Sequence, residues 1–402
     1  MRAVVAPSSL ADRLGLDRAG TVSLRVPGRL VSAQWMPASQ LDADELYLSR
    51  DLLRALALHP GMRLRVRTDG RTLEFGPFVG VMAPRPFRRG ARYGRQTTFF
   101  QRLMRAGAAM GIPTYIFSAG HVRWAPPRVR GHLWRPGRGW FRVTLPVPHV
   151  LYDRTHLTRR VRAIQKRLAA RFGTRQFNEP VGSKWWQYRL LLQDPQLARY
   201  LPETRRLSLA SLADMLRRHG SVYVKAGLGG KGLRIWRITR RRRGYLCEYT
   251  DGAARLHRTW TPRLAPIAAY LRRRPRGPHI VQERLPLLRV GGSIVDLRVL
   301  AQRDGTGEWR VTGIGVRVGR RGSIVSNLFG GGRAVRLEAL LQRVFPRPED
   351  AEAKRREIEE LALAVARRID QACRCVGELG IDIGLDREGR LWFIEANSRT
   401  GR

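Results

Sequence analysis

Residues 222–232, VYVKAGLGGKG, place four glycines and two lysines between two segments that alternate apolar and polar residues. SVYVK precedes the glycines and LRIWRITR follows them, and both have the period of two that is typical of a β-strand. A dinucleotide-binding loop requires a helix directly after its glycines, because the pyrophosphate rests on the helix N-terminus. The pattern therefore predicts a β-hairpin with a glycine-rich loop and excludes a Rossmann fold.

Other glycine-rich phosphate loops do not match either. A P-loop needs a glycine five residues before its Gly-Lys pair and a serine or threonine after it, and here Lys225 and Gly232 occupy those positions. The HRD and DFG segments of a protein kinase are missing. We therefore expect a flap that lays N–H and ammonium groups over a polyphosphate, or a hairpin without a ligand. The flap residues are Lys225, Gly227, Gly229, Gly230, Lys231 and Gly232.

The segment GIDIGLDREGRLWFIEANSRTGR indicates a second hairpin. A two-residue turn at Glu388-Gly389 places Asp382 opposite Glu395, and Asn397 shares the face of Glu395. Facing carboxylates in apolar strands repel each other unless a cation lies between them. The three oxygen-bearing side chains suit Mg²⁺ or Mn²⁺, and the alternative is neutralisation of the carboxylates by two arginines.

Two arginines between these hairpins are candidate anion ligands. SIVDLRVLAQRDGTGEWRVTGIGVRVG reads as a strand pair that carries Arg298 and Arg317, and a guanidinium group binds phosphate or carboxylate oxygens in pairs. SNLFGGGRA then offers Asn327 and three glycines as another backbone-rich anion cradle. Arg298 and Arg317 are therefore candidates to hold a γ-phosphate or a substrate carboxylate.

Length and composition predict a globular chain of two or three domains. The 402 residues are 43% hydrophobic, which is enough for more than one core. Roughly the first eighty residues read as short strands. TVSLRV alternates Val22, Leu24 and Val26 inward, and Asp69-Gly70 is a hairpin signal.

Alternating helix and strand patterns follow from residue 87 onward. They predict a helix over 97–110, a strand over 114–120 and a loop in RWAPPRVRGHLWRPGRGW, which is rich in proline and glycine. Further helices are expected in GSKWWQYRLLLQDP with Ser183 as N-cap, in LSLASLADMLRRHG with Leu209, Leu212 and Leu216 on one apolar face, and in PEDAEAKRREIEELALAVARRIDQACRCV. The remaining predicted strands are 221–225, 233–238, 279–283, 294–302, 309–318, 381–386 and 391–397.

The chain is extremely basic, with a net charge of +44. From Arg85 to Arg175 there are twenty-one basic residues and one acidic residue, Asp153. Such a field attracts nucleic acid, an anionic polymer or an acidic protein, and the alternative is a solvated surface without a specific partner.

The three cysteines match no disulfide framework or metal spacing, and no signal peptide or apolar run of eighteen residues is present, so we expect a soluble cytoplasmic protein.

The order of these segments resembles the ATP-grasp family, and more closely its YheC/YheD type, which is described as endospore coat-associated. The shared string is a lysine with a glycine flap, VQERLPL, DLRVL, NLFGGGRA, GIDIGLD and FIEANS, and ELYLS, GPFVGVM and LPVPHVLYDR extend the closer likeness. The resemblance implies an α/β (α+β) ATP-grasp fold. Its domains are a β-rich domain over 1–82, a basic α/β pre-ATP-grasp domain over 83–179 and an ATP-grasp domain over 180–402, with a flap lobe over 180–285 and a metal lobe over 286–402.

The resemblance also implies a role for each residue singled out above. Lys184 and Lys225 would contact the phosphates of ATP, with the flap Gly227 to Gly232 closing over them, and Asn327 would also bind the nucleotide. Arg298 and Arg317 would be catalytic and face the γ-phosphate or the acyl acceptor. The adenine hinge would be Gln282, Glu283, Arg284 and Leu285, and the magnesium ligands would be Asp382, Glu395 and Asn397.

Family members that are enzymes use ATP to phosphorylate a carboxylate, and an amine or thiol then displaces the phosphate. The resemblance therefore implies an ATP-dependent carboxylate-amine ligase with peptide or polymer substrates, placed in the mother-cell cytoplasm or with spore-coat proteins. Ala226 stands where a proline is usual, the loop lacks a serine, and Thr400 replaces a proline. Two alternatives stay open: a nucleotide-binding coat-assembly protein that has lost catalysis, and a polyanion-binding protein that uses residues 85–175.

Overall fold

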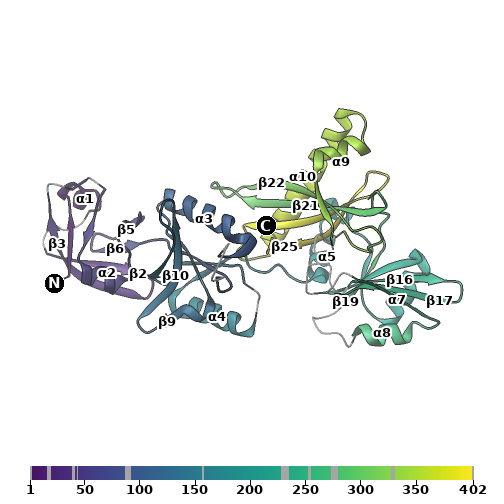
Figure 1. The fold of residues 1–402 in the computed structure, drawn as a ribbon, viewed down its shortest axis with the longest axis horizontal. Coiled ribbons are helices and arrows are strands. Elements are labelled where there is room, and N and C mark those ends of the chain that lie inside the picture. Colours follow the sequence, from purple (N-terminus) through teal and green to yellow (C-terminus); the bar gives the residue numbers. More distant parts are fainter. Residues whose placement is uncertain are drawn as a thin grey trace. The chain divides into compact units, whose positions relative to one another are not determined.

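The computed structural model describes residues 2–15, 20–38, 41–42, 44–86, 92–155, 158–227, 235–251, 255–272, 279–326 and 331–400. The chain divides into two compact units, with the boundary between Asn178 and Glu179. Both units combine sheets with helices, which confirms the α/β class (Figure 1). The further division of the first unit at residue 82 stays a prediction. Among the described residues, no helix is long and apolar enough to cross a bilayer.

A mixed six-stranded sheet forms the first part of the first unit. Its elements are β1 (Ala3–Ala6), α1 (Ser8–Arg13), β2 (Thr21–Val26), β3 (Arg29–Pro37), β4 (Tyr47–Leu48), α2 (Arg50–Leu56), β5 (Val66–Thr68) and β6 (Thr72–Phe75), and the strand order is β4-β1-β3-β2-β6-β5. Val22, Leu24 and Val26 are buried at alternate positions of β2, as predicted. The predicted hairpin at Asp69-Gly70 is also confirmed, because β5 and β6 pair antiparallel.

A second sheet, seven-stranded, completes the first unit. Its elements are β7 (Val79–Met82), η1 (Gly94–Gln96), α3 (Thr97–Ala109), β8 (Thr114–Phe117), η2 (Ala119–His121), β9 (Val122–Trp124), β10 (Pro127–Arg135), β11 (Gly139–Leu145), β12 (Val150–Asp153), α4 (Arg159–Phe172) and β13 (Arg175–Phe177). The order is β11-β10-β8-β7-β12-β13, with β9 beside β10, and β8, β7, β12 and β13 are parallel. Phe100 of α3 packs with Ile116, and Leu168 of α4 packs with Leu151 in a separate cluster.

The predicted loop in RWAPPRVRGHLWRPGRGW is wrong, because this segment supplies most of β9, β10 and the start of β11. Val129 and Leu133 are buried at alternate positions of β10, a strand period that the prolines and glycines obscure. Pro127 is the first residue of β10, a position that tolerates proline. Gly137, with φ of +75°, lies in the turn into β11.

The second unit begins with an antiparallel six-stranded sheet, which we call the flap lobe. It contains α5 (Lys184–Leu192), α6 (Pro195–Ala198), β14 (Thr204–Arg206), α7 (Leu209–His219), β15 (Ser221–Ala226), β16 (Ile235–Arg241), β17 (Gly244–Thr250), β18 (Leu256–Thr261), α8 (Ala265–Arg272) and β19 (His279–Glu283), in the strand order β14-β19-β15-β16-β17-β18. The hairpin of β15 and β16 is confirmed. Leu212 and Leu216 of α7 pack on Val222, whereas Leu209, at the first helical position, is exposed instead of joining their face as predicted.

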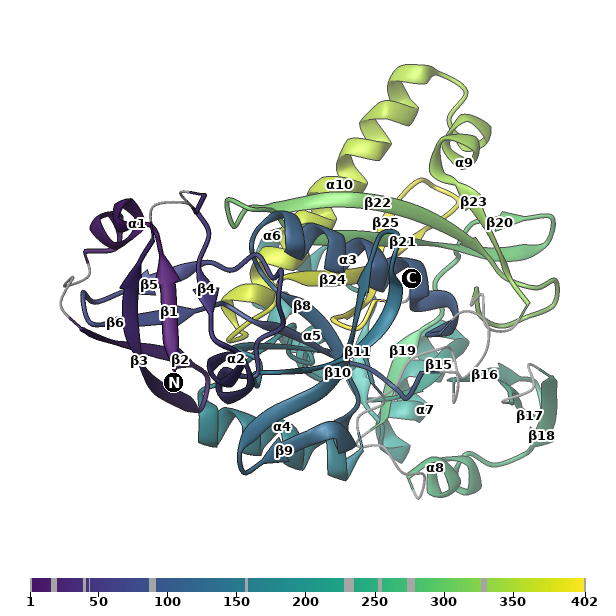
Figure 2. The same ribbon diagram turned by 60° about the vertical axis from the view of Figure 1, so that its left-hand side comes forward.

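The rest of the second unit, which we call the metal lobe, is a second six-stranded sheet with helices packed against it (Figures 1 and 2). Its elements are β20 (Arg289–Val290), β21 (Ser293–Arg303), β22 (Trp309–Val318), β23 (Arg333–Arg336), α9 (Leu337–Val344), α10 (Pro348–Gln371), β24 (Glu378–Leu385) and β25 (Leu391–Asn397). The order is β23-β22-β21-β24-β25, with β20 beside β21. Leu191 of α5, Leu340 of α9 and Ile358 of α10 share one core cluster with β21.

The turn between β24 and β25 differs from the prediction. Leu385 pairs with Leu391, so residues 386–390 form the connection instead of a two-residue turn at Glu388-Gly389. Asp386 shapes this longer turn, because its carboxylate accepts the N–H groups of Glu388 and Arg390. The hydrogen bonds to the buried Asp386 carboxylate stabilise the longer turn over the two-residue turn that Gly389 favours.

A β-bulge between Asp382 and Ile383 offsets the register shift that the longer turn introduces between β24 and β25. Ile383 pairs with Phe393, whereas Asp382 pairs with Glu395, so Ile394 is the additional residue in β25. The predicted pairing of Asp382 with Glu395 is therefore confirmed, although the predicted turn is wrong.

Candidate functional site

The start of α5 and the end of β25 bring an ammonium group and a carboxylate into contact. Ser183 caps α5 by accepting the N–H of Trp186, as predicted, and Lys184 is the first helical residue. The Lys184 Nζ lies 2.6 Å from Glu395 Oε2, and the two side chains are only 13% and 15% exposed. Burial acts to raise the pKa of Glu395, but Lys184 and the amide of Asn397 outweigh it and lower the pKa to about 2. Glu395 is therefore ionised at neutral pH.

The Asp382 carboxylate lies between two guanidinium groups. Arg298, directly opposite Asp382 in the β21–β24 ladder, donates from Nε and Nη2 to its two oxygens. The Arg317 Nη2 lies 3.0 Å from Asp382 Oδ2. Arg317 also donates to both oxygens of Asp296, and Asp296 Oδ2 accepts the hydroxyl of Ser326 at 2.6 Å. Although burial acts to lower the pKa of Arg317, Asp382 and Asp296 raise it, so this guanidinium stays charged.

Lys225, near the end of β15, extends the cluster into the flap lobe. Its ammonium donates to Gln282 Oε1, and Gln282 Nε2 donates to Thr204 Oγ1 at 2.9 Å. Burial lowers the pKa of Lys225 to about 8, while the charge of Glu395 acts in the opposite direction. An oxyanion placed beside Lys225 would therefore stabilise its charged form.

Two hydrogen bonds hold β15 and the start of the glycine loop in place. The N–H of Lys184 donates to the carbonyl of Gly227 at 3.0 Å, so the glycine segment begins beside the N-terminus of α5. The Tyr223 hydroxyl donates to the carbonyl of Ile324 at 2.7 Å, which joins β15 to the segment after β22. The two lysines consequently belong to one connected site.

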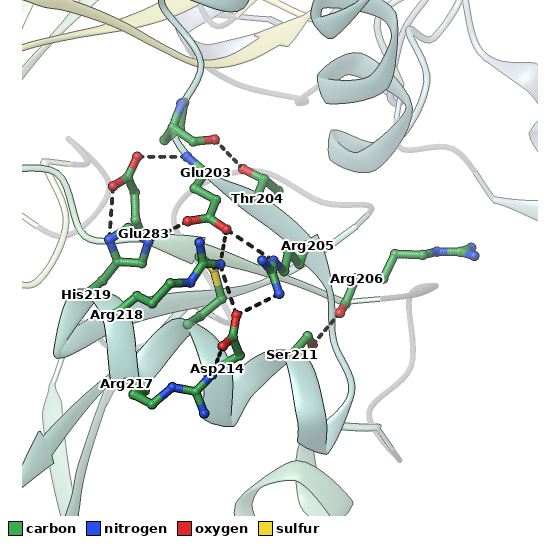
Figure 3. A network of polar contacts seen from close by, with 12 residues as sticks. Glu203, Thr204, Arg205, Arg206, Ser211, Asp214, Arg217, Arg218, His219 and Glu283 are labelled. Atoms are coloured by element: carbon green, nitrogen blue, oxygen red, sulfur yellow. Dashed lines mark hydrogen bonds and ion pairs between the residues drawn. The ribbon is translucent and has the colours of Figure 1, made fainter.

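The predicted hinge strand is bound into a polar network at the end of α7 (Figure 3). Glu283 Oε1 accepts the N–H of Glu203 at 2.7 Å, and Oε2 lies 3.3 Å from His219 Nδ1. His219 Nε2 lies 2.7 Å from Glu203 Oε2, and Arg218 also contacts Glu203. Burial acts to raise the pKa of Glu203, but His219 and Arg218 outweigh it and lower the pKa. The network fixes the hinge strand and occupies the Glu283 side chain.

Of the remaining predicted ligands, some are described by the structure and others are not. Arg284 is exposed and its N–H donates to the carbonyl of Ser221, while Leu285 is half-buried. Five of the predicted ligands lie outside the described residues: Gly229, Gly230, Lys231, Gly232 and Asn327. The structure brings together Lys184, Lys225, Arg298, Arg317, Asp382, Glu395 and Asn397.

The donor chemistry of β24 and β25 fits a hard divalent cation. Asp382 and Glu395 are paired in the ladder, and Asn397 lies two residues after Glu395, so three side chains with oxygen donors gather at one place. Within the described part of the chain, no three His, Cys, Asp or Glu residues form a metal-binding group; the third donor of this set is the amide of Asn397. Arg298 and Arg317 balance Asp382, as the alternative interpretation of the hairpin expects, whereas a lysine, Lys184, balances Glu395.

A model of the YheC/D-like ATP-grasp family matches residues 173–402, a range that contains every site residue described above. The chain belongs to the YheC/D-like ATP-grasp family. The ATP-grasp fold implied by the sequence is thereby confirmed.

Two relatives in Bacillus subtilis (strain 168) carry the same family name. The endospore coat-associated protein YheD is 27% identical over 371 residues, which cover 88% of this chain and 79% of YheD. The endospore coat-associated protein YheC is 21% identical over 271 residues, which cover 65% of this chain and 73% of YheC. Among solved structures, the ATP-grasp ligase PsnB complexed with minimal precursor matches at 16% identity and a TM-score of 0.46, covering 81% of this chain and 91% of that chain.

One residue of this YheC/D-like ATP-grasp site, Gln187, was missed by the sequence reasoning. Its side-chain amide donates to the carbonyl of Ala396 and accepts the N–H of Ala396, both at 2.9 Å. Ala396 lies between Glu395 and Asn397, so Gln187 holds the backbone that carries both side chains. The sequence signal that could have indicated Gln187 is its position three residues after Lys184, which places both side chains on the same face of α5.

Replacing Gln187 by leucine is expected to lower the free energy of unfolding by about 1–3 kcal/mol, because the backbone groups of Ala396 lose their buried partners. Urea unfolding of the full chain measures this change. Gln193→Leu, at the exposed C-cap residue directly after the same helix, is the control and should alter stability by less than about 0.5 kcal/mol. Equal losses in the two variants would contradict the positioning role.

Thr400, which stands where the family pattern has a proline, is integrated into the metal lobe. It is buried, and its hydroxyl donates to the buried carboxylate of Glu378, which also accepts Gln302 Nε2 at 2.8 Å. A proline has no hydroxyl and would leave this Glu378 oxygen without that donor. The departure therefore has a structural partner in this chain.

Proposed function

We propose that the protein binds ATP together with Mg²⁺ or Mn²⁺ in the second unit. The observation that carries this proposal is the contact of Lys184 with Glu395, because it places a cation for phosphate oxygens next to a carboxylate for a metal ion. Lys184 and Lys225 would hold phosphate oxygens, and Asp382, Glu395 and Asn397 would hold the metal. The metal ion would bridge phosphate oxygens and neutralise their charge.

We further propose a carboxylate-amine or carboxylate-thiol ligase reaction. A carboxylate oxygen of the first substrate attacks the γ-phosphorus of ATP, and a P–O bond forms as the bond to ADP breaks. The nitrogen or sulfur of the second substrate then attacks the acyl carbon, loses its proton and displaces inorganic phosphate. Lys184 and Lys225 orient the triphosphate, while Arg298 and Arg317 stabilise the charge of the transferred group. No side-chain nucleophile is required.

The substrates that we propose are a peptide or polymer carboxylate and an amine, in the mother-cell cytoplasm or at the spore coat. The names of YheD and YheC support the coat association. A long substrate is also consistent with the basic character of the first unit, which attracts acidic polymers.

A second candidate function is nucleotide binding without turnover, as part of coat assembly. One observation favours it: Arg298 and Arg317, the two arginines that a transferred phosphoryl group would need, both contact Asp382. Catalysis would require at least one of them to exchange this partner for the substrate.

Isothermal titration of the full chain with ATP tests the proposal. Binding is expected in the presence of Mg²⁺, with an affinity about tenfold or more weaker without it, since the metal removes repulsion between phosphates and the buried carboxylates. ADP formation with a panel of acids and amines then separates a ligase from the second candidate. Absence of ATP binding with and without Mg²⁺ would refute both.

A further inference from the structure

The β9–β10–β11 region of the first unit carries positive charge on one face. Alternate residues of a strand share a face, and directly paired residues of neighbouring strands lie side by side. The antiparallel ladder pairs Arg128 with Arg123 and His132 with Arg142. We call the residues of this face the basic stripe: Arg123, Arg128, Arg130, His132 and Arg142. All four of its arginines are exposed.

The basic stripe lies at the carboxyl ends of parallel strands. His132 pairs with Ile116, the penultimate residue of β8, and β10 runs antiparallel to β8, so Arg130 and Arg128 extend beyond the end of β8. Arg85 follows β7 and His121 follows β8 at the same edge. β7 lies between β8 and β12; the chain passes from β7 to β8 on one side and, after β11, returns to β12 on the other side, so the direction of strand addition reverses at β7. In open α/β sheets, ligands bind outside the carboxyl ends of the strands at such a point.

The groups around the stripe are close enough to act on one another. Burial lowers the pKa of His121, and Arg85, Arg130, Arg142 and Arg123 lower it further. Burial likewise lowers the pKa of His132 to about 4, followed by the charges of Arg92, Arg142 and His121. Every charged neighbour named here is basic, so the positive potential of the stripe is concentrated at one edge of the sheet.

His132 adds a buried donor to this edge. It is 6% exposed, and its Nδ1 lies 3.1 Å from the hydroxyl of Tyr93. Burial raises the pKa of Tyr93, so the phenol keeps its proton and can donate it to Nδ1; in that arrangement the ring proton of neutral His132 is on Nε2. Across the part of the chain that the structure describes, His132 Nε2 has no hydrogen-bond partner. A buried N–H without a partner is costly, and an anion oxygen would satisfy it.

We propose that the basic stripe, with Arg85 and His121, is a binding site for an anion that carries several phosphate groups. Arg128 and His132 are four residues apart, which corresponds to about 13 Å along a strand and exceeds the size of one phosphate. Arginine forks match phosphate oxygens in pairs, and His132 supplies a neutral N–H at the buried end. A short oligophosphate and a phosphodiester polymer share this chemistry. Its residues all belong to the first unit, whereas the ATP site proposed above is built from residues of the second unit.

The test compares two double variants of the full chain in titrations with sodium tripolyphosphate. Arg130→Gln with Arg142→Gln removes two exposed charges of the stripe, and Arg54→Gln with Arg162→Gln removes two exposed charges on α2 and α4. The stripe variant is expected to bind about tenfold or more weakly than wild type, and the control variant within about twofold. Wild type and both double variants have the same second unit, so any tripolyphosphate that this unit binds contributes equally to all three titrations. Thermal unfolding checks that both variants fold.

Two further titrants identify the ligand chemistry and its source. Citrate, a tricarboxylate, is expected to bind at least about tenfold more weakly than tripolyphosphate at equal ionic strength. If a single-stranded oligonucleotide binds more tightly than tripolyphosphate and the stripe variant loses this affinity, the ligand is a phosphodiester polymer. If tripolyphosphate binds more tightly than the oligonucleotide, the ligand is a short oligophosphate. Equal binding of citrate, equal loss in both double variants, or no binding by wild type would each overturn the proposal.

Discussion

Replacing Glu395 by glutamine is expected to abolish the Mg²⁺ dependence of ATP binding and to weaken binding by about tenfold or more. Glutamine has the same size but lacks the negative charge that pairs with Lys184 and that would hold the metal. The same change leaves the largely buried ammonium of Lys184 without its partner, so the free energy of unfolding should fall by about 3 kcal/mol. Isothermal titration and urea unfolding measure the two effects separately.

Glu388→Gln is the matched control for this variant. Glu388 lies in the turn of the same hairpin, is exposed, and uses only its backbone N–H in the contact with Asp386. Its replacement should leave ATP affinity within about twofold and stability within about 0.5 kcal/mol. If Glu395→Gln bound Mg²⁺ and ATP as wild type does, the assignment of the site would be wrong.

The second large effect is expected from Asp382→Asn, which should lower the free energy of unfolding by about 3–5 kcal/mol. The buried carboxylate of Asp382 is shared by Arg298 and Arg317, and asparagine cannot balance either charge. Removing Arg298 in the same protein, as Arg298→Met, should restore part of the loss because the unpaired charge is then gone. Urea unfolding of the single and double variants gives this coupling directly.

An exposed aspartate-arginine pair provides the comparison. Asp350 lies 2.7 Å from Arg347, and their side chains are 40% and 73% exposed. Asp350→Asn should cost no more than about 1 kcal/mol, since water screens this pair and replaces its contacts. A loss in Asp382→Asn no larger than this one would mean that the carboxylate does not hold the two arginines.

The strands of the second unit were predictable because their apolar runs alternate with few interruptions. The pairing of Asp382 with Glu395 followed from this period, and the glycine hairpin followed from the strands on both sides of it. The region of β9 to β11 was not predictable by the same rule, because prolines and glycines indicated a loop more strongly than Val129 and Leu133 indicated a strand. In that region the composition indicated a loop and the apolar period indicated a strand, and the pairing with neighbouring strands in the sheet makes it a strand.

Contacts between distant segments were beyond a single sequence. Gln187 and Ala396 are 209 positions apart, and the spacing of Gln187 from Lys184 does not indicate which backbone groups its side chain contacts. The same holds for the Glu203–His219–Glu283 network, whose members come from three different segments (Figure 3). The charges of Lys184, Arg298 and Arg317 were each identified, but which carboxylate each one contacts depends on the strand order of the metal-lobe sheet and on where α5 packs.

The bulge at Ile394 has a consequence for comparing this chain with its relatives. The turn sets the register near Leu385, whereas the bulge sets the register of Asp382 and Glu395. A relative without the bulge would therefore lack one residue between its turn and its acidic pair. Alignments should place a single-residue gap at Ile394 and keep Glu395, Ala396 and Asn397 contiguous, or the acidic pair will be assigned to the wrong face of the strand.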